Sequence, residues 1–84
     1  MSNPVVIREI SKNRRERLRI CLDNYQGHDL IDLRVTTQLT EGTDQWMPTK
    51  KGVCVNVALL PELVEALQAA EAKARELGLI GGAA

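Results

Sequence analysis

Positively charged side chains gather in the first half of the chain, and two aromatic rings lie among them. Residues 8–19 include six basic residues against two acidic ones, and Lys50 and Lys51 form a second basic cluster. Tyr25 and Trp46 are the only aromatic residues among the Phe, Tyr and Trp types. Because cations follow phosphates while rings stack on unpaired bases, this combination suits a single-stranded nucleic acid.

The residue types that catalysis or metal binding would need are few. His28 is the only histidine, and Asp32 lies two residues from Arg34, which favours an ion pair over a general base. Cys21 and Cys54 with one histidine cannot close a four-ligand zinc site without carboxylate help. We therefore expect no enzyme, no metal and no cofactor, and we expect two reduced thiols.

Length and composition indicate one small domain. The 84 residues are 44% hydrophobic but lack phenylalanine, so the core must consist of Leu, Val, Ile and Ala. We expect the domain to span residues 1–78 and a flexible tail to span 79–84. No apolar run could cross a bilayer and no signal-peptide pattern is visible, which predicts a cytoplasmic protein without a membrane partner, associated with the nucleoid if it is bacterial.

Alternating apolar and polar residues predict strands. Residues 17–23 and 28–36 alternate on either side of a short turn, which predicts an antiparallel hairpin. Arg17, Arg19 and Arg34 then share the face opposite to the apolar one. Further strand segments are predicted at residues 4–10, 45–48 and 52–57, with a polar loop over 36–45.

The last third of the chain changes to a helical period. Asn56 is a plausible N-cap, Pro61 suits the first turn, and Gly78 is a C-cap signal. A helix of about twenty residues would be about 30 Å long, more than a small sheet can cover. We therefore expect a homodimer formed through the apolar stripe of the helix, at Leu60, Leu63, Val64, Leu67 and Ala70.

The stretches YQGHDLIDLR and WMPTKKGVCV, followed by one terminal helix, resemble a known family. They are similar to the single-stranded-DNA-binding domain of the positive cofactor four family of transcriptional coactivators, and IREISKNRRERLRI resembles its bacterial-type branch. The resemblance runs from about Arg17 to Leu67. It implies an α+β fold, with a curved antiparallel sheet of four to five strands, one C-terminal helix, and a homodimer whose helices pack together.

The resemblance also assigns roles to single residues. Tyr25 matches the stacking aromatic of the first turn, Arg34 matches the strand arginine, and Lys50 and Lys51 match the pair that grips the nucleic-acid backbone. With the other basic and aromatic residues, the candidate binding residues are Arg14, Arg15, Arg17, Arg19, Tyr25, His28, Arg34, Trp46, Lys50 and Lys51.

Four positions depart from the family pattern. His28, Gln26 and Met47 replace basic residues, and Thr37 stands where the family has a second stacking aromatic. Trp46 could supply the missing stacking, or it could instead cover the small core.

These observations predict a homodimeric protein that binds single-stranded or melted DNA. Phosphate capture and base stacking would act with little sequence readout, in transcription regulation as a coactivator or in genome maintenance. The expected partners are single-stranded DNA, a second copy of the chain and the transcription machinery. Two alternatives stay open, which are an RNA-binding module and a structural dimerisation domain that binds no nucleic acid.

Overall fold

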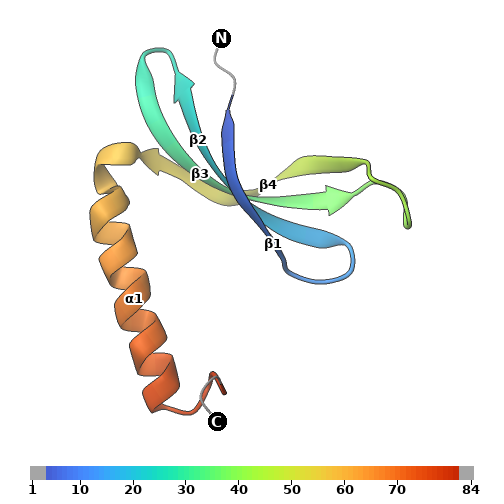
Figure 1. Cartoon of the computed structure of the whole chain (residues 1–84). Coiled ribbons are helices and arrows are strands. Elements are labelled where there is room, and N and C mark those ends of the chain that lie inside the picture. Colours follow the sequence, from blue (N-terminus) through green and yellow to red (C-terminus); the bar gives the residue numbers. More distant parts are fainter. Residues whose placement is uncertain (1–3, 82–84) are drawn as a thin grey trace.

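The computed structural model describes residues 4–81 and shows one open sheet followed by one helix (Figure 1). A short 3₁₀ helix, η1, joins the last strand to the α-helix. The elements are β1 (Val5–Ser11), β2 (Glu16–Tyr25), β3 (His28–Gln38), β4 (Trp46–Asn56), η1 (Val57–Leu59) and α1 (Leu60–Glu76).

The sheet is an antiparallel meander in the order β1-β2-β3-β4. The predicted α+β fold is therefore confirmed, with four strands and a C-terminal helix. The strand predicted at residues 4–10 corresponds to the edge strand β1. The predicted hairpin corresponds to β2 and β3, which extend beyond the predicted bounds by up to two residues.

The segments predicted at 45–48 and 52–57 form a single strand, β4. Pro48, which has no N–H to donate, is tolerated because β4 is an edge strand of the sheet. The register with β3 shifts between the pairs Arg34–Gly52 and Thr36–Pro48. Three residues of β4 thus stand against one residue of β3, and this bulge contains the two lysines.

Glycines permit one tight turn and one close approach between two strands. Gln26 and Gly27 both have positive φ, of 52° and 83°, which suits the two-residue turn between β2 and β3. Gly52 has φ 143°, and a Cβ there would collide with the carbonyl oxygen of Leu33 and lie 2.9 Å from the Arg34 Cα. The close approach of β4 to β3 after the bulge therefore requires glycine.

The helix ends as expected, but its N-cap differs from the prediction, and it stands away from the sheet (Figure 1). The Asn56 side chain accepts a hydrogen bond from the Ala58 N–H, and so caps η1 rather than α1. Pro61 lies in the first turn of α1, and Gly78 follows its end with φ 75°. The predicted tail, residues 79–84, begins within the described part, and 82–84 lie outside it.

Few side chains are buried within this single chain. Among the described residues, only Cys21, Ile31, Val35 and Thr36 are buried, and α1 contributes none. The radius of gyration is 15.2 Å, whereas a compact domain of this length would have about 12 Å. The isolated chain is therefore an extended shape with a small core.

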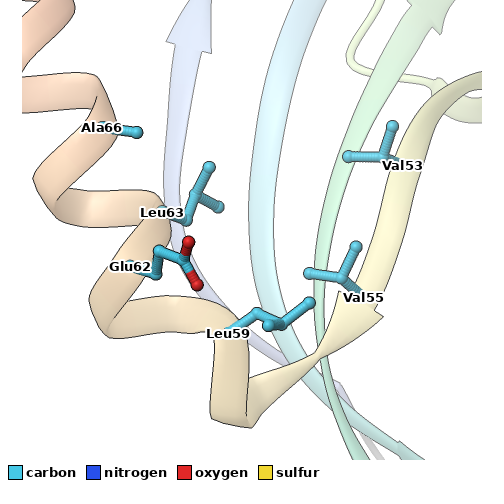
Figure 2. A pocket seen from close by; sticks show the side chains of 6 residues that line it. All are labelled: Val53, Val55, Leu59, Glu62, Leu63 and Ala66. Atoms are coloured by element: carbon cyan, nitrogen blue, oxygen red, sulfur yellow. The ribbon is translucent and has the colours of Figure 1, made fainter.

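An apolar groove lies between the last strand and the helix (Figure 2). Side chains of Leu59 and Leu63 lie between α1 and two valines of β4. The lining residues are Val53, Val55, Leu59, Glu62, Leu63 and Ala66. Because Val53 and Val55 alternate with Gly52 and Cys54, the groove opens on the sheet face that carries the other apolar strand residues.

Candidate nucleic-acid interface

Three arginines lie on one face of the sheet, which we call the arginine face. Arg17 and Arg19 are two residues apart on β2 and so point to the same side, and Arg34 of β3 stands directly opposite Arg19 in the register. Successive side chains of a strand point to opposite faces, so all three project from the side opposite to Leu18, Ile20 and Leu22. The expectation that these arginines share a face agrees with the register.

The aromatic and histidine candidates occupy the two ends of the same face. Tyr25 pairs with His28 beside the β2–β3 turn, and Trp46 pairs with Gln38 at the start of β4. Tyr25 is 64% exposed. Arg17, which contacts Trp46, and Tyr25 are eight positions apart on β2, so the arginine face extends about 27 Å between the two rings.

Arg34 is held in place by contacts within the sheet. Its Nη2 donates to Asp32 Oδ1 at 2.7 Å, and its Nη1 donates to the Lys50 carbonyl oxygen at 3.3 Å. The hydrogen bond to Asp32 raises the pKa of the Arg34 guanidinium. This geometry confirms the interpretation that Asp32 pairs with Arg34, and it ties the bulge of β4 to β3.

Arg17 is also fixed, by one residue on each side of β2. Its Nη1 donates to Glu9 Oε1 of β1 at 3.1 Å. Its guanidinium carbon lies 3.9 Å from the centroid of the Trp46 ring. Trp46 is half-buried and lies on the arginine face, not on the apolar face.

Arg19 lacks such a partner. No ion pair within residues 4–81 involves Arg19, and its Nε is buried without a hydrogen-bond partner. The hydroxyl of Thr36, which stands opposite Arg17 on the neighbouring strand, is likewise buried without a partner. Among the described residues, Glu9 stands opposite Arg19 in the register but pairs with Arg17, so Arg19 has no ion pair of its own.

A family model matches residues 8–66 of the chain, and its description is Transcriptional Coactivator p15 (PC4). The chain belongs to this family. The PC4 family consists of non-enzymatic DNA-binding domains, which confirms the prediction that the chain is not an enzyme. It also shows that the chain is a nucleic-acid-binding, coactivator-like domain.

Solved structures show the same PC4 fold. The chain is similar to a PC4 homolog from Burkholderia pseudomallei K96243 in its tetragonal crystal form, with 23% identity, a TM-score of 0.70, and coverage of 82% of this chain and 98% of that one. For the orthorhombic form the identity is 23%, the TM-score is 0.72, and the coverage is 82% and 90%. No curated protein matches the chain.

Lys50 and Lys51, the basic pair expected from the resemblance, have different surroundings. The backbone of Lys50 accepts the hydrogen bond from Arg34, whereas Lys51 Nζ lies 3.7 Å from Glu16 Oε2. Glu16 alternates with Arg17, so Lys51 leans toward the side of the sheet away from the arginine face. Hydrogen bonds from Asn13 and Lys12 lower the pKa of Glu16.

Arg14 and Arg15 lie at the tip of the β1–β2 hairpin, away from the centre of the arginine face. Arg15 Nη2 donates to the Gln38 carbonyl oxygen at 3.0 Å, and Arg14 pairs with Glu41 of the β3–β4 loop at 3.2 Å. The Thr37 hydroxyl donates to the Arg15 carbonyl oxygen at 3.3 Å. Thr37 therefore links the β3–β4 hairpin to the β1–β2 hairpin through this hydrogen bond.

The two cysteines flank Asp32 in the register, one on each neighbouring strand. Cys21 is buried, which raises the pKa of its thiol, and Cys54 is exposed. Because two strand spacings separate them by about 10 Å, they are too far apart for a disulfide.

Sequence reasoning missed Glu9 as a member of this face. Its signal is weak, because Glu9 lies in the short edge strand and only the β1–β2 pairing brings it opposite Arg19. Within residues 4–81, no group of three or more His, Cys, Asp and Glu side chains could hold a metal ion. In the same part of the chain, no helix has the length and hydropathy needed to cross a membrane.

Proposed function

We propose that this protein binds single-stranded or melted DNA on its arginine face, by phosphate capture and base stacking, with little sequence readout. The observation that carries the proposal is the placement of Arg17, Arg19 and Arg34 on one face of the sheet, between Tyr25 at one end and Trp46 at the other. Cations between two rings suit a flexible backbone with unpaired bases. This activity would serve transcription or genome maintenance, beside the transcription machinery.

The protein acts as a homodimer in this proposal. Val64 and Leu67 of α1 are 43% and 57% exposed in the single chain, and the apolar groove at Leu63 is open. So small a core would leave an 84-residue monomer only marginally stable. A second copy offers the same apolar helix and groove, so one self-complementary interface would cover both. Leu60 and Ala70 complete the stripe.

Dimerisation and DNA binding would use opposite faces of the sheet. The groove valines point away from the arginine face, because they alternate with Gly52 and Cys54 along β4. A partner chain seated on the groove therefore leaves the three arginines open to a ligand.

Competition binding tests this function. A fluorescent oligodeoxythymidylate is bound to the protein, and unlabelled single-stranded DNA, RNA and duplex DNA compete for it at several salt concentrations. We expect single-stranded DNA to compete best and affinity to fall steeply with salt, because each neutralised phosphate releases counterions. Stronger competition by RNA would favour an RNA-binding module, and a lack of binding to any of the three would favour a structural dimerisation domain.

A further inference from the structure

Glu9, Arg17 and Trp46 form a chain of contacts across three elements. Glu9 Oε1 on β1 accepts from Arg17 Nη1 on β2 at 3.1 Å, and the Arg17 guanidinium lies over the Trp46 ring on β4 at 3.9 Å. The carboxylate and the ring are linked through a single guanidinium. Glu9 can therefore influence the position of the ring through Arg17.

The strand pairing alone would not place Glu9 with Arg17. In the register, Glu9 stands opposite Arg19, and Ser11 stands opposite Arg17. The carboxylate thus reaches diagonally to Arg17, a distance that long side chains can span. An arginine has many rotamers, so a fixed carboxylate restricts the guanidinium to the few that cover the indole.

We propose that Glu9 is a positioning residue for base stacking: it holds Arg17 over Trp46, and the Arg17–Trp46 pair is the site of base stacking at the end of the arginine face opposite Tyr25. The inference rests on the proposed function. Both members of the Glu9–Arg17 pair are more than one third exposed and Trp46 is half-buried, so a ligand can reach all three side chains. Thr36, which stands opposite Arg17 on β3, is 2% exposed and lies buried beside it.

Glu9 also has an effect of the opposite sign. Its negative charge lies on the face that we propose binds phosphates, so removing the carboxylate should by itself tighten the binding of any strand. Positioning acts only on strands that carry bases, whereas charge acts on every strand. A ligand without bases therefore separates the two effects.

The test compares Glu9→Ala and Glu9→Gln in the wild-type chain and in a Trp46→Ala chain, with oligodeoxythymidylate and an abasic oligonucleotide of equal length as probes. Trp46→Leu replaces Trp46→Ala if that variant melts early. Glu9→Ala should weaken binding of oligodeoxythymidylate about five-fold, the low end of one stacked base. Glu9→Gln, whose amide oxygen can still accept from Arg17, should bind at least as tightly as wild type. On the abasic strand, or without Trp46, Glu9→Ala should not weaken binding.

The opposite pattern would overturn the inference. If Glu9→Ala and Glu9→Gln tighten binding equally on both probes and in both backgrounds, Glu9 is only an opposing charge. If the wild-type protein binds neither probe, the proposed function fails and the inference fails with it. The fluorescence of Trp46 in the free protein is a readout that needs no ligand: Glu9→Ala should change its emission and Glu9→Gln should not.

Discussion

Arg19 and Arg34 stand directly opposite each other on β2 and β3, two like charges on one face of the sheet. Asp32 neutralises Arg34 at 2.7 Å, and no ion pair among the described residues neutralises Arg19. Like charges directly opposite each other destabilise a sheet, and the Asp32 carboxylate reduces this repulsion. The relationship makes Arg19 the main candidate for a phosphate contact.

Replacing Arg19 by glutamine should therefore weaken the binding of single-stranded DNA. The slope of log affinity against log salt should fall by about one, because one phosphate contact is lost. The melting temperature should stay equal or rise, since a like-charge pair is relieved. Arg75→Gln, on α1 and away from the arginine face, is the matched control. An unchanged salt slope for Arg19→Gln would rule out this role.

Trp46→Ala should reduce affinity and leave thermal stability nearly unchanged. The ring lies on the arginine face against Arg17, so its removal should cost the stacking of a base, about 1–3 kcal/mol. In the wild-type protein, single-stranded DNA should quench the fluorescence of this sole tryptophan. Emission that does not respond to saturating DNA, with a variant that melts early, would contradict the expectation.

Replacing Lys50 and Lys51 together by alanine should weaken binding to all sequences alike and leave the fold intact. Both residues lie in an exposed bulge. The side chain of Lys51, which pairs with Glu16, is 70% exposed. An ion pair so exposed contributes little to stability. Because Glu16 offsets Lys51, the single variant Lys50→Ala should lose more affinity than Lys51→Ala. A double variant that binds like wild type would mean that the two lysines do not contact the nucleic acid.

Leu67→Asp should give a monomer or an unfolded chain. If α1 packs against a second copy, a charge in that seam costs several kcal/mol. The control is Gln68→Asp, one residue along on the same helix. In the single chain Leu67 is 57% exposed, so a monomeric protein should tolerate both changes equally. Sedimentation at micromolar concentration and thermal melting distinguish these outcomes.

Glu16 should make stability depend on pH in the acidic range. Hydrogen bonds from Asn13 and Lys12 lower its pKa below the ordinary 4.5. Its contribution is therefore fully present above the unfolded-state pKa, and it is lost as the pH falls through the lower folded-state pKa. Melting temperatures measured from neutral to acidic pH should decline less steeply for Glu16→Gln than for wild type. Equal slopes would mean that Glu16 does not stabilise the hairpin tip.

The alternation of residues along single strands was enough to determine much of this protein. The period of two in β2 and β3 predicted that Arg17, Arg19 and Arg34 share a face, and the change to a helical period predicted α1. These features are local, since the backbone alone dictates where successive side chains point. The pairing of Asp32 with Arg34, two residues apart on one strand, could be predicted for the same reason.

Only the tertiary structure decided which residues meet across strands. Sequence reasoning separated the two halves of β4, because Pro48 weakens a strand signal unless the strand is known to lie at an edge. The bulge before Gly52 turns Lys51 toward Glu16, which no local pattern shows. Glu9 reaches Arg17 through the register of β1 with β2, and register depends on contacts between segments that are distant in the sequence.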